Sequence, residues 1–151
     1  MGALRSHTDL LCPEGNMMKR DMDLIRDLLL LIEGGKKVFE LLDAENAAAL
    51  GVDPTTDMTA EEVAKYEYHL ELLQEAGFVE LTQRSGGNWY VKRMTYAGHD
   101  FLDSVRDPEI WRNTKKNAAL AGGFSVDLLK ALAKGLLKKK IEQHTGVEME
   151  F

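Results

Sequence analysis

The sequence predicts a mainly helical fold with one small β-hairpin, which is an α+β arrangement. The stretch that decides this places Leu70 and Leu73 at helical spacing and follows them with Gly77. A glycine at this place supplies the left-handed backbone conformation that commonly ends a helix. Phe78 and Val79 come directly afterwards and begin an apolar strand, so a helix here breaks straight into a hairpin.

Length and composition limit the class of protein. The 151 residues predict one domain with a helical appendage. The net charge of −6 and the pI of about 5.2 count against nucleic-acid binding, because domains that bind nucleic acids tend to be basic. Cys12 is the single cysteine, which excludes an internal disulfide and favours a reducing, cytoplasmic compartment. No apolar run approaches the ~20 residues that span a bilayer, so no membrane-spanning segment is expected, and no membrane is expected as a partner through one.

Residues 1–17 are expected to be a disordered or non-native N-terminal extension. Pro13 and Gly15 interrupt this stretch, and its apolar residues follow no sustained period. A strongly helical segment begins directly after Met17 and Met18, which suggests that the natural start is at one of these methionines.

Two helices are predicted next. Residues 21–33 carry a wide apolar stripe, and Asp21 and Asp23 favour the positive N-terminal end of that helix. Residues 36–50 are predicted to be helical because they include three consecutive alanines, which have high helix propensity. Pro54 belongs to the loop that follows.

A third helix and a hairpin come after this loop. Thr59 and Glu62 form a capping box, which starts a helix that runs to Ala76. Residues 79–84 and 89–94 are predicted strands, and the four-residue connection between them contains two adjacent glycines.

Further helices complete the chain. Thr95 caps a helix through Arg106, and Pro108 begins a short helix. Two glycines then link to a last helix over residues 126–144, which Ser125 caps.

The order of helix, helix, helix, two-stranded wing and helix predicts a winged helix-turn-helix module over residues 18–106. Residues 107–151 are predicted to be a helical C-terminal appendage. This fold predicts binding rather than catalysis as the class of activity.

Two resemblances follow from these motifs. Residues 69–79 resemble the end of the recognition helix in ArsR and MarR-like winged-helix repressors. Over most of the chain, residues 18–26, 68–73, 95–103 and 106–108 resemble a bacterial and phage family, domain of unknown function 2513. The second resemblance implies a bacterial or prophage origin and supports a start at the second of the two methionines. It implies no activity.

Double-stranded DNA is the leading expected target, with the 61–76 helix in the major groove and the 83–89 wing on the backbone. The residues placed for DNA contact are Lys65, Tyr68, His69, Arg84, Asn88, Lys92 and Arg93. Lys65 would read guanine, whereas the wing cations would hold phosphates. The charge of residues 59–80 opposes this docking, because six acidic residues stand against Lys65 alone and leave a net charge of −5.

A protein-interaction module on the same scaffold is the alternative function. The interface candidates are Trp111, Phe124, Leu129, Leu132 and Leu136, and burial of Trp111 and Phe124 is expected. Residues 125–145 combine an apolar stripe with five lysines against two acidic residues. Three interpretations of this last helix stay open. It packs on the core with a solvated lysine face, it pairs antiparallel across a homodimer, or its lysines contact a membrane surface or nucleic acid.

No enzyme activity, metal or cofactor is expected. His7, His69, His99 and His144 are scattered and lack the spacing of a metal site. The paired glycines of the hairpin are not followed by the lysine and hydroxyl residue of a phosphate-binding loop. For His69, the sequence leaves open a partly buried packing position or a groove contact.

Overall fold

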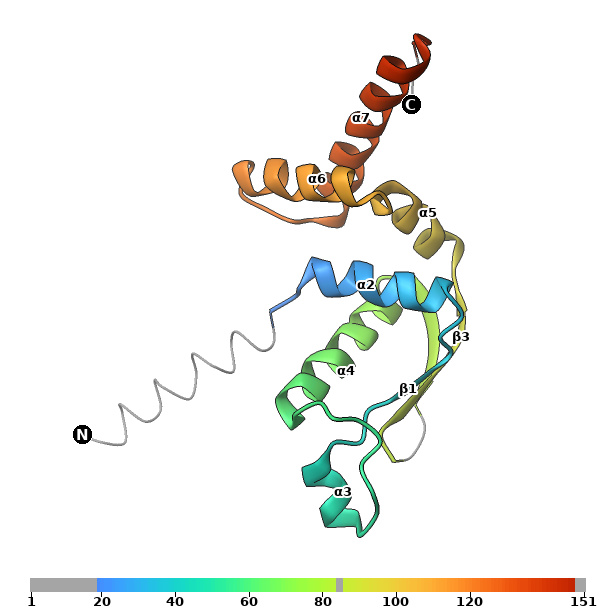
Figure 1. Cartoon of the computed structure of the whole chain (residues 1–151), viewed down its shortest axis with the longest axis vertical. Coiled ribbons are helices and arrows are strands. Elements are labelled where there is room, and N and C mark those ends of the chain that lie inside the picture. The colour runs from blue at the N-terminus through green and yellow to red at the C-terminus, as the bar shows by residue number, and fades with distance from the viewer. Residues whose placement is uncertain (1–18, 84–85, 149–151) are drawn as a thin grey trace, which may run out of the picture. The chain divides into compact units, whose positions relative to one another are not determined.

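The computed structural model describes residues 19–83 and 86–148, and it divides the chain into two compact units. Unit 1 is Met1–Met94 and unit 2 is Thr95–Phe151. The described part is mainly helical with one three-stranded antiparallel sheet, as Figure 1 shows. The predicted N-terminal extension and Arg84 lie outside the described residues. None of the described helices combines the length and hydropathy needed to cross a bilayer.

The first described helix, α2 (Met22–Glu33), confirms the prediction for residues 21–33. Asp21 is its N-cap, and the carboxylate of Asp21 accepts hydrogen bonds from the backbone N–H groups of Asp23 and Leu24. The buried residues of α2 recur at helical spacing and face the core of unit 1; they are Met22, Ile25, Leu28, Leu29 and Ile32.

The predicted helix over residues 36–50 is wrong in its first half. Strand β1 (Val38–Glu40) takes that place, and helix α3 (Ala44–Leu50) begins only after its N-cap, Asp43. The physical reason is tertiary pairing: β1 joins the sheet antiparallel to β3 and buries the ring of Phe39 to 2 % exposure. β-Branched and aromatic residues suit such a half-buried strand, and this overrides local helix propensity.

Helix α4 (Ala60–Glu75) confirms the predicted capping box. The N–H of Thr59 donates to the Glu62 carboxylate over 2.8 Å, and the N–H of Glu62 donates to the Thr59 hydroxyl over 3.1 Å. Gly77 follows the helix with a φ of 75°, in the left-handed region that was expected to end it.

The sheet has the order β1-β3-β2, with β2 (Val79–Gln83) and β3 (Asn88–Met94) joined by the predicted hairpin. A register shift between Glu80 and Leu81 interrupts the pairing of β2 with β3. Helices α2 and α4 pack on this sheet and enclose the core of unit 1 (Figure 1).

Unit 2 consists of α5 (Tyr96–Val105), α6 (Pro108–Leu120) and α7 (Val126–Thr145). The sequence predicted that α5 belongs to the winged-helix module of residues 18–106. In the structure, α5 packs with α6 and α7 in unit 2. The helix after Pro108 is longer than expected, because buried residues continue along one face of α6 as far as Ala118.

Candidate functional site

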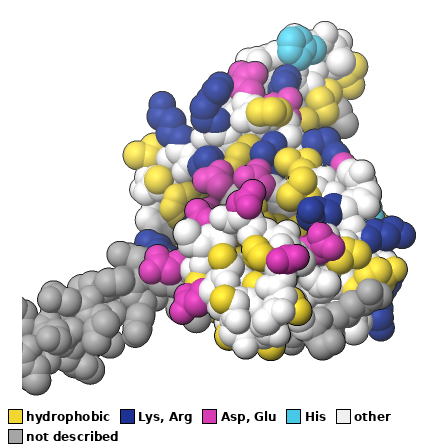
Figure 2. Space-filling view, turned by 60° about the horizontal axis from the view of Figure 1, so that its bottom comes forward, with side chains coloured by type: hydrophobic (Ala, Val, Ile, Leu, Met, Phe, Trp, Pro, Cys, Tyr) yellow, Lys and Arg dark blue, Asp and Glu magenta, His cyan; other side chains and the backbone are white. Residues whose placement is uncertain are grey.

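The surface expected to contact DNA is formed by the outer side of α4 and by strands β2 and β3, and we call it the α4–hairpin surface. Exposed carboxylates dominate the described part of α4; they belong to Glu61, Glu62, Glu71 and Glu75. Unit 1 as a whole contains ten lysines and arginines against 17 acidic residues, a net charge of −7. Figure 2 shows acidic side chains set among exposed hydrophobic ones on one face of the molecule.

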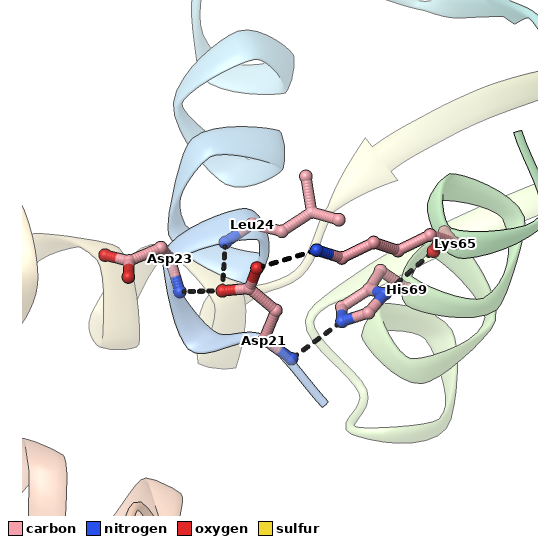
Figure 3. Close-up of polar contacts among 5 residues, drawn as sticks. All are labelled: Asp21, Asp23, Leu24, Lys65 and His69. Carbon is pink, nitrogen blue, oxygen red and sulfur yellow. Dashed lines mark hydrogen bonds and ion pairs between the residues drawn. The ribbon is translucent and has the colours of Figure 1, made fainter. Parts of the chain in front are cut away.

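Lys65 does not point freely to solvent from α4. Its Nζ lies 3.0 Å from Oδ2 of Asp21, the N-cap of α2, as Figure 3 shows. Burial opposes ionisation of Asp21. The hydrogen bond and charge of Lys65, together with the N–H groups of Leu24 and Asp23, outweigh that effect and lower the pKa of Asp21. The ion pair is half exposed and adds little stability, but it compensates the one cation of α4.

His69 is fully buried on the inner side of α4. Its Nε2 lies 2.8 Å from the backbone nitrogen of Asp21, and its Nδ1 lies 2.7 Å from the carbonyl oxygen of Lys65 (Figure 3). Because a backbone N–H can only donate, Nε2 must accept, and the ring proton therefore sits on Nδ1 and is donated to Lys65. Both ring nitrogens are thus occupied, and a groove contact by His69 is incompatible with this position.

The other residues that were predicted to contact DNA differ in their exposure and in their hydrogen-bond and ion-pair partners. Tyr68 is half-buried, and its ring lies nearly perpendicular to the His69 ring at a centroid distance of 5.6 Å. Asn88 begins β3, and its Oδ1 is buried with no hydrogen-bond partner among the described residues. Arg93 is exposed but forms a two-point hydrogen bond to Glu80 across the strands, at 2.9 and 3.2 Å. Lys92 is exposed on β3, and no ion pair to it is found within the described part of the chain.

A cleft beside α4 was not predicted from the sequence. The indole Nε1 of Trp89 donates a 2.9 Å hydrogen bond to the carboxylate of Glu67, which ties β3 to α4. Next to this contact is a cleft of about 430 Å³, lined by Glu71, Gln74, Glu75, Leu81 and Trp89. The four-residue spacing of Glu67, Glu71 and Glu75 was a signal for it, because that spacing places side chains along one side of a helix.

The interface candidates of unit 2 divide into core and surface positions. Trp111 is buried, as expected, and Leu129 is buried too. Leu132 and Leu136 are half-buried. The expectation that Phe124 is buried is wrong: it is 42 % exposed, because it lies in the connection after α6 rather than on a packed face.

Two lysines of α7 form ion pairs with the rest of unit 2. Lys130 lies 2.7 Å from Asp100, and Lys140 lies 3.0 Å from Asp107. The hydrogen bond and charge of Lys130 lower the pKa of Asp100. A backbone hydrogen bond from Ile110, followed by the bond from Lys140, lowers the pKa of Asp107. In turn, the bond to Asp107 raises the pKa of Lys140. Two of the five lysines of α7 therefore have a carboxylate partner within unit 2 and need no external ligand.

A metal centre has no support among the described residues, where no three histidine, cysteine or carboxylate side chains gather to hold an ion. The candidate site is a surface formed by an acidic helix, a neighbouring cleft and a hairpin.

Comparison with known proteins decides the family. The family model described as "Hypothetical protein (DUF2513)" matches residues 19–125. The chain belongs to this family. The resemblance of the sequence to DUF2513 is thereby confirmed, and the match extends from the start of the described residues to the N-cap of α7.

A curated relative supports the DUF2513 assignment. A Haemophilus influenzae protein described as "Uncharacterized protein" is 31 % identical over 130 residues, which cover 82 % of this chain and 99 % of the relative. No solved structure matches the chain.

Proposed function

We propose that unit 1 is a winged-helix module that works by binding rather than by catalysis. The order of its elements supports this fold: α2, the short strand β1, helices α3 and α4, and then the β2–β3 hairpin. β1 completes the sheet by pairing with β3. In this assignment α4 occupies the place of the recognition helix, and the hairpin is the wing.

The proposed ligand of the α4–hairpin surface is a protein that presents lysine or arginine side chains. The observation that carries this proposal is that carboxylates of unit 1 already compensate two predicted DNA-binding cations. Lys65 is paired with Asp21, and Arg93 is paired with Glu80. Non-specific DNA affinity comes mainly from cations that displace counterions from phosphates, so an acidic α4 would be repelled by a duplex. A basic protein surface has the complementary charge.

The cleft beside α4 suits a long basic side chain. Glu71 and Glu75 supply carboxylates, whereas Leu81 and Trp89 supply apolar surface. Lysine and arginine can lay their aliphatic stems on apolar surface while the charged end reaches a carboxylate. The fixed indole–Glu67 hydrogen bond keeps Trp89 in place beside the cleft.

A DNA-binding transcriptional regulator of bacterial or prophage origin is the second candidate. The order of the elements favours it, and Lys92 is exposed on the wing. Because the outer side of α4 is acidic, the duplex would then be held through the wing rather than by α4 in the major groove.

Two parallel selections with the purified full chain distinguish the candidates. One selects from a random duplex pool at low and moderate salt, and the other selects from a library of random peptides. We expect enrichment of peptides rich in lysine and arginine, and loss of their binding to the Glu71→Lys, Glu75→Lys variant. Enrichment of a common duplex motif, with no such peptides, would replace the protein partner by DNA.

A further inference from the structure

The outer edge of the sheet at β1 is open. The N–H of Val91 donates to the carbonyl of Lys37 over 2.7 Å, and the N–H of Leu41 donates to Gly87 over 3.3 Å. Residues 37, 39 and 41 therefore direct their backbone groups toward β3. Because backbone direction alternates along an antiparallel strand, residues 36, 38 and 40 direct theirs away from the sheet.

The open segment has a defined limit at its C-terminal end. The backbone of Leu42 exchanges hydrogen bonds with Thr55, whose N–H donates over 2.9 Å and whose hydroxyl accepts over 3.0 Å. The N–H of Lys36 is also occupied, by the carbonyl of Leu31 at 3.0 Å. Along the described chain, β1 has a strand on one side only, and the backbone groups of Val38 and Glu40 face the other side. A row of outward N–H and C=O groups of this kind is a template for another strand.

A cleft of about 280 Å³ runs beside this edge. Its lining is mixed: Leu31, Val38, Met58 and Tyr66 supply apolar surface, and Lys36, Glu40, Thr55 and Thr56 supply polar groups. Leu31 is 45 % exposed although it belongs to α2, and it adds apolar surface close to the open strand. A strand added to β1 would have apolar side chains to pack against, as well as backbone groups to bind.

The charges along β1 indicate which strand fits. Val38 and Glu40 lie on one side of β1, and Lys36, two residues before Val38, takes the same place in the alternation, with its Nζ 5.1 Å from the centroid of the Phe39 ring. The sequence along this side therefore runs from a positive residue through an apolar one to a negative one. If a second copy of β1 pairs antiparallel about Val38, each Lys36 stands directly opposite Glu40 of the second copy. Opposite charges in directly facing positions stabilise antiparallel pairs.

We propose that the chain forms a two-fold symmetric dimer through antiparallel pairing of its β1 edges. The Val38 N–H of each copy donates to the Val38 carbonyl of the other, and the Glu40 N–H donates to the Lys36 carbonyl. This contact is self-complementary, as a closed two-fold interface requires. Shifting the register by two residues in either direction loses the Lys36–Glu40 pairs, and one of these shifts also runs the strand into the loop that covers Leu42.

This dimer surface is separate from the α4–hairpin surface, so it does not depend on the partner proposed there. It also differs from the α7 pairing that the sequence left open. An extended peptide from another protein could use the same backbone edge, but it would not reproduce the reciprocal charges of a second copy.

The test is the mass of the full chain in solution, measured by sedimentation equilibrium over a range of concentrations. Lys36→Glu and Glu40→Lys each place like charges opposite each other twice and should weaken the dimer about tenfold, whereas the combined swap should restore it. Lys37→Glu is the matched control: it makes the same charge change one residue away, on the other side of the strand, and should leave the dimer intact.

A second variant tests the backbone contact. Val38→Pro removes an N–H that faces away from β3, so it should abolish the dimer while the far-ultraviolet circular dichroism spectrum shows that the fold persists. A monomeric wild-type chain at every concentration would overturn the proposal. So would a dimer whose dissociation constant is the same in the Lys36→Glu, Val38→Pro and wild-type chains, which would place the interface elsewhere, with α7 as the next surface to examine.

Discussion

The backbone N–H of Asp21 donates a 2.8 Å hydrogen bond to Nε2 of His69, and this bond joins the start of α2 to the middle of α4. The same aspartate carboxylate caps α2 and pairs with Lys65, one turn before His69. Asp21 thus joins α2 to α4 at two points. Its side chain contacts Lys65, 44 residues later, and its backbone N–H contacts His69, 48 residues later. His69, for which the sequence left open a partly buried packing position or a groove contact, is a buried structural link.

Replacing His69 by phenylalanine should destabilise unit 1. A flat ring still fills the site, although phenylalanine is somewhat larger than histidine, and the Asp21 N–H loses its acceptor in a buried place, which typically costs about 1–3 kcal/mol. Urea unfolding followed by circular dichroism measures the change in the free energy of unfolding. Tyr68→Phe is a suitable control, because it alters a neighbouring aromatic residue outside this hydrogen-bond chain. Equal stability of His69→Phe and wild type would contradict the structural role.

Glu67 and Glu71 should behave differently although both are glutamates on α4. Glu67→Ala leaves the indole N–H of the buried Trp89 without its acceptor and should cost about 1–2 kcal/mol. Glu71→Ala removes only an exposed carboxylate and should change stability by less than about 0.5 kcal/mol. Thermal and urea unfolding of the two variants provide the comparison, and equal losses would show that the Trp89 contact is not maintained in solution.

Neutralising the cleft should exchange one ligand preference for another. Glu71→Gln with Glu75→Gln should weaken binding of basic peptides and strengthen non-specific binding to DNA, because the repulsion from phosphates is reduced. The matched control, Asp53→Asn with Asp57→Asn, removes the same charge from the loop before α4. A salt titration of duplex binding that is identical for the two double variants would exclude any approach of α4 to DNA.

The Asp107–Lys140 pair predicts pH dependence of stability on both sides of neutrality. The pKa of Asp107 is lowered in the folded protein, so its stabilisation is present above the unfolded value of 3.8 and is lost as pH falls below it. The pKa of Lys140 is raised, so its stabilisation is present below the unfolded value of 10.5 and is lost as pH rises through the folded value. Urea unfolding of Lys140→Met across pH should show a flatter profile than wild type at both ends. Lys139→Met, an exposed neighbour, should leave the profile unchanged.

Local chemistry accounts for the parts of the fold that the sequence predicted correctly. The Thr59 capping box and the glycine after α4 each act within a few residues, and each appears in the structure where it was expected. Asp21 lies at the start of α2 as expected, and the structure makes it the N-cap. The hairpin turn is of the same kind, since Gly86 and Gly87 have φ values of 80° and 81°.

The errors come from contacts between distant residues. β1 was assigned to a helix because its strand conformation depends on pairing with residues 88–90, and no neighbouring residue signals that partner. Lys65 was taken as an outward residue, and His69 was left open between packing and a groove contact, because α2, which supplies their common partner Asp21, is remote in sequence. Charge composition, by contrast, needs no knowledge of the fold, and it had already predicted that the outer side of α4 is acidic.

The position of β3 between its two neighbours has a consequence for folding kinetics. β3 meets β2 across a short turn, but the pairing of Phe39 with Trp89 closes a loop of 50 residues that contains α3 and α4. Closing the longer loop costs more chain entropy, so the hairpin should form early and β1 should join it late. A substitution such as Phe39→Leu should therefore speed unfolding while leaving the folding rate nearly unchanged, so that β1 controls how long the native state survives more than how quickly it is reached.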